Sequence, residues 1–398
     1  MKTSKRHPNG ERCRFLTCMK MLLLGTIPMR IVIQYLGGSK MESAFSRPQI
    51  VFMLLLSLGI SNHVFIIPHL IQAAGRDAWI SILLGYAVLI GWSFILIRVL
   101  KSMGTSLFSD WLHARIGLWG GWMFRVLLLL YILVLAVMIV FDTTRNIDIY
   151  LLPKTPNTVV VVSFVLISYW AASAGLKTIV YMSAVLLPIV WLLGIGISIF
   201  TMGSKDYGIM FPIWAEGLRP NLNGSVIVVG GSVELLLLLL IQHNMRRPVD
   251  YKTLFVLLTL LVGLIAGPTF GSLSAFGPAE AGNMRIPAFE QWRLLMLGDY
   301  ISHVDFLAAF QLMSGSVTRT ALLVHLLPQL LTGRSGKFRQ TIMVVGAAIA
   351  SIPSLLQVSD ITMQGAIHNY FYLSSFLFGI VLITGLFAIT CIKRKKGA

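Results

Sequence analysis

Long apolar runs separated by short polar segments make up most of the 398-residue chain. A helix needs about 20 mainly apolar residues to cross the hydrocarbon core of a bilayer, and ten runs reach or approach that length. They are Gln49–Ile71, Trp79–Leu100, Met123–Thr143, Thr158–Ala174, Thr178–Met202, Ser225–Gln242, Thr253–Ser272, Phe306–Leu330, Ile342–Leu356 and Tyr370–Ile392. The pattern therefore predicts an all-α membrane protein with about ten transmembrane helices.

Small and polar residues interrupt the first and the sixth of these runs, which open two successive sets of five. Glycine weakens helical backbone, and an unwound turn in lipid exposes main-chain groups that need a ligand, an ion or water. Paired interruptions in the two halves of a chain indicate a transporter-type binding site. We therefore predict a ligand-binding cradle made of Gly59, Ser61, Asn62, Gly230, Gly231 and Ser232. The alternative is that these glycines only let neighbouring helices pack closely.

Two ionisable residues lie at membrane depth in the predicted bundle. Glu234 follows the interruption of the sixth run, and Arg319 lies in the eighth run beside a polar stripe that includes Ser314 and Thr318. Because a stripe with helical spacing faces the bundle interior, we expect Ser314 and Thr318 to line the same cavity. Arg319 needs an acidic partner, and Glu234 and Asp305 are the two candidates. Ion coupling and the fixing of helix register are both open as roles for such a pair.

Composition and charge agree with a membrane protein. Hydrophobic residues make up 56% of the chain and charged residues 12%, whereas a soluble domain carries about 25% charged residues. The net charge of +17 comes from Lys and Arg between the apolar runs, which favours contact with anionic membrane lipid and excludes a nucleic-acid partner. Of the 32 Lys and Arg residues, 24 flank the runs on one side and seven on the other. The positive-inside rule therefore predicts cytoplasmic N and C termini.

The sequence offers no recognisable catalytic pattern. It contains no nucleophile elbow, no HExxH pair and no Walker loop. Its three cysteines form neither a CxxC pair nor a Cys/His cluster with metal spacing. We therefore expect a protein that is not an enzyme and that carries no cofactor and no metal.

The chain divides into a short N-terminal extension, 1–46, and a ten-helix permease-like membrane domain, 47–398. In the extension, the apolar stretch Met21–Ile33 is too short to span a membrane and is interrupted by Pro28 and Arg30. It is either an amphipathic surface segment or part of a misassigned start, with Met41 the true one. We expect the extension to be cytoplasmic and assign it no role.

Three short motifs carry a family resemblance. Gly75–Ser81 reads GRDAWIS between the first two runs, Leu151–Pro156 reads LLPKTP after the third, and Gly175-Leu176 opens the fifth, which contains Pro188. From about Met41 to its C-terminus, the chain resembles the spore germination B-subunit family, the permease-like subunits of endospore germinant receptors.

The resemblance implies a fold, a location and partners. The family belongs to the amino acid–polyamine–organocation superfamily, whose LeuT-like fold is a 5+5 inverted-repeat bundle with broken first and sixth helices. Its members sense small, amino acid-like nutrients in the spore inner membrane. They trigger germination together with a receptor A subunit and a lipoprotein C subunit.

Two departures from the family pattern leave the ligand open. Lys177 and Tyr181 stand where members commonly have an acidic residue and an arginine, and Arg319 stands where they commonly have a lysine. Besides a sensor, the sequence is compatible with an amino acid transporter coupled to protons through Glu234. A scaffold for partner subunits is a third alternative.

Overall fold

The computed structural model describes residues 44–295, 305–332 and 338–392. The predicted N-terminal extension lies outside the described residues, except for its last three. Within the described part the chain is helical throughout, and its only extended pairing is an isolated bridge between Phe45 and Met245. The all-α fold class predicted from the hydrophobic pattern is confirmed.

The ten predicted spans all occur as helices among the described residues. Seven helical stretches are long and apolar enough to cross a membrane, and the first, Arg47–Met103, holds two of the predicted spans. The shorter apolar helices Asn157–Ser173 and Arg339–Leu355 complete the set. The chain is therefore a multi-pass membrane protein.

The elements follow one another in the order that the apolar runs predict. The α-helices are α3 (Arg47–Ile60), α4 (Ile66–Ala74), α5 (Ala78–Met103), α6 (Phe108–Asn146), α7 (Asn157–Ser173), α8 (Leu176–Phe200), α9 (Leu218–Ser232), α10 (Leu238–Ile241), α11 (Tyr251–Asn283), α12 (Pro287–Arg293), α13 (Phe306–Thr332), α14 (Arg339–Leu355), α15 (Asp360–Ala366) and α16 (Tyr372–Thr390). π-Helical segments cover η1 (Ser61–Phe65), η3 (Ile147–Leu151) and η8 (Ile367–Phe371). 3₁₀ segments cover η2 (Gly75–Asp77), η4 (Met202–Ser204), η5 (Tyr207–Met210), η6 (Val233–Leu237) and η7 (Gln242–Asn244).

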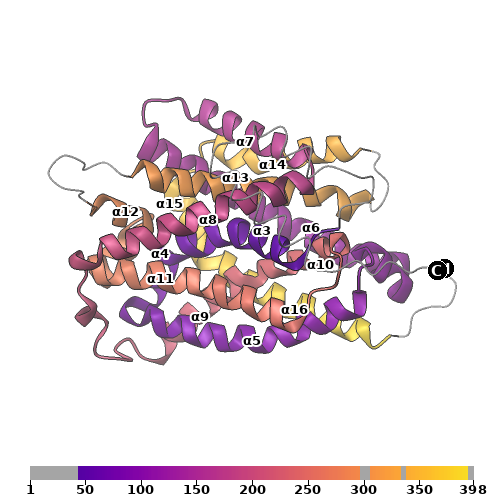
Figure 1. Cartoon of the computed structure of the whole chain (residues 1–398), viewed down its shortest axis with the longest axis horizontal. Helices are drawn as coiled ribbons and strands as arrows, with labels where there is room; N and C mark the ends of the chain where they lie inside the picture. The colour runs from indigo at the N-terminus through magenta and orange to yellow at the C-terminus, as the bar shows by residue number, and fades with distance from the viewer. Residues whose placement is uncertain (1–43, 296–304, 333–337, 393–398) are drawn as a thin grey trace, which may run out of the picture. The chain divides into compact units, whose positions relative to one another are not determined.

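The sixth span forms the interior of the bundle. In the stretch Leu218–Asn244, 94% of the most apolar window is buried by protein, against 22% in α8. Neighbours surround it, because α9 packs against α4, α5 and α16. Figure 1 shows α3 in the middle of the view, between a group of α7, α13 and α14 and a group of α5, α9 and α16. The two interrupted spans are therefore inner helices, and helices such as α8 face lipid.

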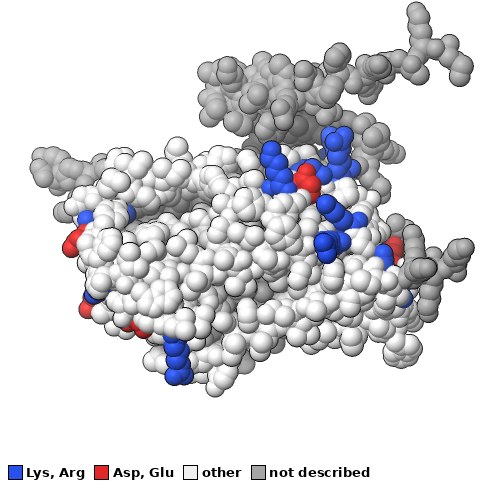
Figure 2. All heavy atoms as spheres, turned by 90° about the horizontal axis from the view of Figure 1, so that it is seen from below, with Lys and Arg blue, Asp and Glu red and all other residues white. Residues whose placement is uncertain are grey.

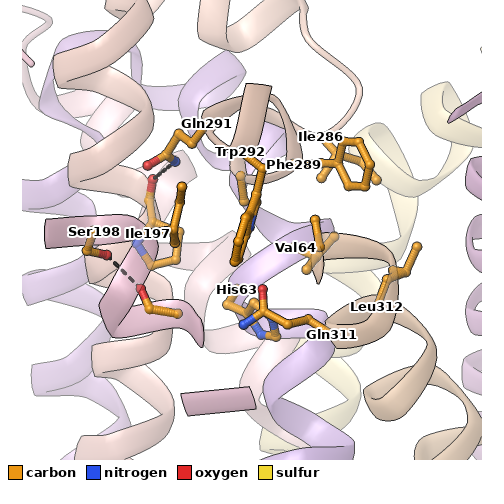
Figure 3. Close-up of a pocket in the computed structure, with 14 residues that line it drawn as sticks. His63, Val64, Ile197, Ser198, Ile286, Phe289, Gln291, Trp292, Gln311 and Leu312 are labelled. Carbon is orange, nitrogen blue, oxygen red and sulfur yellow. Dashed lines mark hydrogen bonds between the residues drawn. The ribbon is translucent and has the colours of Figure 1, made fainter. Parts of the chain in front are cut away.

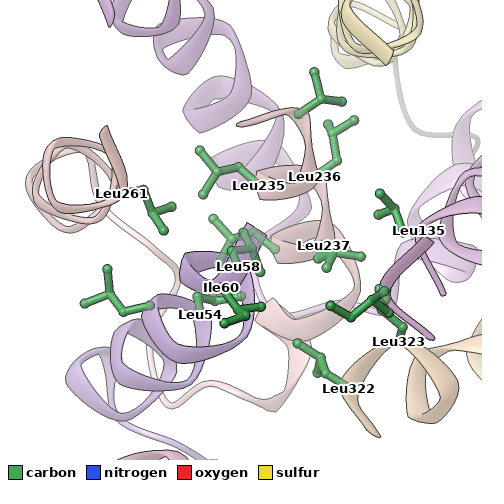
Figure 4. Close-up of a cluster of buried hydrophobic side chains, with 14 of the residues drawn as sticks. Leu54, Leu58, Ile60, Leu135, Leu235, Leu236, Leu237, Leu261, Leu322 and Leu323 are labelled. Atoms are coloured by element: carbon green, nitrogen blue, oxygen red, sulfur yellow. The ribbon is translucent and has the colours of Figure 1, made fainter. Parts of the chain in front are cut away.

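Leucines fill the space between the first and sixth spans. Leu58 and Ile60 of α3 lie close to the run Leu235–Leu237 of the sixth span, with Leu135 of α6 and Leu323 of α13 beside them (Figure 4). All of these side chains are almost fully removed from solvent. The first and sixth spans are therefore in apolar contact at these positions in this arrangement.

The GRDAWIS motif ties the turn after the first span to the start of the sixth. Gly75 has φ +54°, a conformation that favours glycine, and lets the chain reverse between α4 and α5. The buried carboxylate of Asp77 accepts hydrogen bonds from the Glu216 main-chain N–H at 2.8 Å and from Asn221 Nδ2 at 3.3 Å. Ser81 donates to Asn221 Oδ1 at 3.2 Å. The motif thereby holds together two segments separated by about 140 residues.

A second connection joins the beginning of the first span to the loop before α11. Arg47 donates to the Pro248 carbonyl at 2.7 Å and forms an ion pair with Asp250. Asp250 also caps α11 by accepting from the Thr253 main-chain N–H at 2.9 Å. Hydrogen bonds from Thr253, together with the charge of Arg47, lower the pKa of Asp250 below its ordinary value. The carboxylate therefore stays ionised at neutral pH and keeps both contacts.

Candidate functional site

The interruption of the first span is a π-helical turn and not an open loop. At its C-terminal side, the Ile66 N–H donates to the Ser61 carbonyl. The carbonyl of Gly59 accepts a hydrogen bond from Nδ1 of His63 at 2.6 Å, so a side chain satisfies a main-chain group at this point. Asn62 is buried and donates to the Leu261 carbonyl of α11 at 3.4 Å. The main chain therefore stays helical where the sequence predicted an unwound turn: Gly59 lies in α3, and Ser61 and Asn62 lie in the π-helical turn.

The interruption of the sixth span begins where α9 gives way to the 3₁₀ segment Val233–Leu237. A Cβ atom on Gly230 would collide with the main-chain carbonyl of Tyr372 in α16, and Ser375 donates to the Gly230 carbonyl at 2.7 Å. A Cβ atom on Gly231 would lie 2.7 Å from Ile66 Cδ1. These two glycines therefore allow close packing of α9 against α16 and α4 in this arrangement.

Ser232, Ser314 and Thr318 are buried, and their hydroxyl groups are occupied by bonds within their own helices. Ser232 donates to the Val228 carbonyl at 2.8 Å, and Ser314 and Thr318 bond back to carbonyls of their own helix at 2.7 Å. The helix that carries them packs against the first span, because a Cβ on Gly315 would meet Ile60. The first, sixth and eighth spans thus meet around the interruptions.

Arg319 forms a buried ion pair with Glu234 of the sixth span. Of the two partners that the sequence offered, the structure selects Glu234. Only 4% of the Arg319 side chain and 3% of the Glu234 side chain are exposed. Glu234 Oε2 and the Nε and Nη1 atoms of Arg319 have no hydrogen-bond partner among the described residues. The pair therefore keeps unused donors and an unused acceptor in the middle of the bundle.

A cavity lies on another side of the first span, beside the π-helical turn. It measures about 70 Å³ and is lined by parts of η1, α8, α11, α12 and α13. Figure 3 shows the indole of Trp292 above His63 and Gln311, with Ile197 and Val64 at the sides. Ligand sites in proteins commonly combine apolar walls with a few polar groups in this way. The cavity was not predicted from the sequence.

A polar network joins the ends of the third and tenth spans to the segment after α11. Arg285 donates to Asn146 Oδ1 at 2.7 Å, lies 3.4 Å from a carboxylate oxygen of Asp142 and forms an ion pair with Asp360. Gln364 donates to the same Asp142 oxygen at 2.7 Å. The residues come from positions up to 222 apart, so no local spacing in the sequence could have revealed this network. It holds three outer segments in one arrangement.

Among the residues that the structure describes, no group of three or more His, Cys, Asp or Glu side chains is placed to hold a metal ion. The ring centroids of His69 and His368 lie 5.6 Å apart, and the Tyr372 ring lies 5.4 Å from that of His69 at an angle of 58°. Two histidines supply too few ligands for a structural metal site, which usually needs four.

Ten helices with an interrupted first and sixth span, meeting around a buried ion pair, define a membrane protein with a transporter-like fold. A manganese transporter of Eremococcus coleocola, solved as a mutant, shares this LeuT-like fold with a TM-score of 0.57, covering 88% of this chain and 78% of that one. With 16% sequence identity, the likeness concerns the fold alone. The family model described as Spore germination protein matches residues 45–354. The chain belongs to this spore germination family, as its motifs predicted.

Relatives support the assignment. The chain is 32% identical to Spore germination protein XB of Bacillus anthracis over 354 residues, which cover 88% of this chain and 99% of that protein. It is 22% identical to Spore germination protein KB of Bacillus subtilis, over 72% of this chain and 77% of the relative. The role of the chain is therefore connected with germination, and its family is permease-like and not a family of enzymes.

Proposed function

We propose that this chain is the nutrient-sensing, permease-like subunit of a spore germinant receptor. The observation that carries the proposal is the family match over residues 45–354, which contains both interrupted spans. In this proposal the chain lies in the spore inner membrane and triggers germination with a receptor A subunit and a lipoprotein C subunit. It binds its nutrient without converting it chemically.

The proposed ligand is a small amino acid-like nutrient held where the first, sixth and eighth spans meet. The cradle would comprise Gly59, Ser61, Asn62, Gly230, Gly231, Ser232, Ser314 and Thr318. Support comes from the matching interruptions and from the unused atoms of Glu234 and Arg319, which offer an acceptor to an ammonium group and donors to a carboxylate. Because Gly230 and Gly231 are in close contact with neighbours, binding requires the bundle to open there.

Signalling would follow from this opening. A ligand shifts an equilibrium between two arrangements by as much as its affinity differs between them. The close contacts of Gly230 and Gly231 and the ion pair of Glu234 with Arg319 stabilise one arrangement. We propose that the nutrient stabilises another, which the partner subunits recognise.

The proposed orientation puts both termini on the spore-core side. The excess of Lys and Arg beside the termini supports it. On the face shown in Figure 2, charged side chains gather near the two ends of the helices, with a largely uncharged belt between them. Such a belt fits the hydrocarbon region of a bilayer.

A sensor and a proton-coupled transporter are distinguished by flux. With the chain in proteoliposomes and each labelled amino acid tested in turn, we expect saturable binding of at least one amino acid without accumulation inside the vesicle. Accumulation that follows an imposed pH gradient and disappears in Glu234→Gln would instead establish the transporter. If none of the tested amino acids binds, the scaffold function is favoured and the proposed nutrient site is contradicted.

A further inference from the structure

The cavity beside the first span has a chemistry different from that of the ion-pair centre. Among the residues that the structure describes, its lining contains no Asp, Glu, Lys or Arg side chain, and its polar groups are His63, Ser198, Gln291 and Gln311. A charged ligand would have to leave water without finding a counter-charge in this lining, which is unfavourable for the same reason as burying an unpaired ion. An uncharged ligand is therefore favoured here.

Hydrogen bonds inside the protein already use one of the two N–H donors of Gln311 and the N–H donor of His63. Gln311 Nε2 donates to the Val190 carbonyl at 2.7 Å, and His63 Nδ1 bonds to the Gly59 carbonyl at 2.6 Å. Since a carbonyl oxygen only accepts, Nδ1 of His63 carries the hydrogen. In the neutral imidazole the remaining nitrogen, Nε2, is then an acceptor, as is Oε1 of Gln311.

These two acceptors lie at the cavity, opposite an aromatic surface. In Figure 3, the amide oxygen of Gln311 points toward the Trp292 ring, and the His63 ring lies next to this amide. No described residue donates a hydrogen bond to either acceptor. Phe289 and Leu312 add further apolar wall. A flat ligand can stack on an indole while its edge donates to both acceptors.

We propose that this cavity is a second ligand site, which binds an uncharged ring compound carrying at least two N–H or O–H donors. Nucleobase-like rings and sugars have this chemistry. The site is separate from the proposed nutrient cradle, and its existence does not depend on the proposed function. Because His63 belongs to the π-helical turn, occupation of the site would act directly on the interrupted first span.

The test is calorimetric binding to the purified full-length chain in lipid nanodiscs. The probes are uracil, nicotinamide and glucose as donor-bearing rings, 1,3-dimethyluracil as a ring without N–H donors, and phenethylammonium and phenylalanine as charged compounds. We expect at least one donor-bearing ring to bind one to one, and we expect 1,3-dimethyluracil and the charged compounds not to compete for it.

Substitution locates the binding. Gln311→Met removes an acceptor and should weaken binding at least tenfold, whereas Gln329→Met, the same change further along α13 and outside this cavity, should leave it unchanged. Trp292→Leu on the short helix α12 should also weaken binding. This variant replaces Gln311→Met in the test if Gln311→Met does not fold. Failure of all three donor-bearing rings to bind would overturn the proposal. The proposal would also be overturned if both cavity variants bound the ring as tightly as the wild type does. Competition by phenethylammonium or phenylalanine would overturn it as well.

Discussion

Replacing Arg319 by alanine is expected to lower the free energy of unfolding by about 3–5 kcal/mol, because it leaves the Glu234 carboxylate buried without its counter-charge. Both side chains are almost wholly inaccessible, so water cannot take over the role of the guanidinium. Thermal unfolding of the purified chain in nanodiscs measures the effect as a drop of the midpoint by several degrees.

A double variant provides the matched control. Replacing a buried pair by apolar side chains of similar volume is often nearly neutral, so Glu234→Met combined with Arg319→Met should recover much of the stability. An unchanged midpoint in Arg319→Ala would show that the pair does not hold the sixth and eighth spans together. Full recovery of stability with loss of nutrient binding would assign the pair to the ligand site.

Gly230→Ala is expected to abolish the nutrient response of spores. The added Cβ would collide with the Tyr372 main-chain carbonyl, which cannot rotate away as a side chain can. Overpacking of this kind typically costs about 1–3 kcal/mol and here would separate α9 from α16. Gly231→Leu should have the same effect through Ile66. The measurement is germination of spores that carry each variant at wild-type abundance in the membrane.

Gly263→Ala is the control for this prediction. Gly263 lies in the membrane-spanning helix α11, and an added Cβ there meets nothing within 4 Å. Since alanine has the higher helix propensity by about 1 kcal/mol, this variant should be at least as stable as the wild type and germinate normally. A normal response in Gly230→Ala would mean that the contact with Tyr372 is not needed and would remove the glycines from the signalling mechanism.

The sequence predicted the helices, and it placed the interruptions just before or at the π-helical turn Ser61–Phe65 and the 3₁₀ segment Val233–Leu237, because helices and weak points depend on local composition. The hydropathy of consecutive residues is enough to recognise the ten apolar runs, and glycines such as Gly230 and Gly231 stand out within them. The sequence also offered Glu234 as a partner of Arg319, because so few charged residues lie at membrane depth. Family likeness supplied the inverted-repeat fold, which hydropathy alone does not determine.

The form of the interruptions and the cavity could not be predicted in the same way. The π-helical turn is accompanied by a contact of His63 with the Gly59 carbonyl, which helical spacing does not reveal. The cavity brings His63 together with Trp292 and Gln311, which lie more than 200 positions further along the chain, and the three carry no motif. The network around Arg285 likewise depends on tertiary contacts. Long-range packing, and not local pattern, decides these features.

The most direct test of the proposed receptor role is to delete this chain and compare germination of the spores with that of intact spores, one nutrient at a time. The account predicts that the deletion removes the response to at least one amino acid-like nutrient, that a restored copy of the chain returns it, and that responses to unrelated nutrients persist. Unchanged germination with every nutrient would contradict the account.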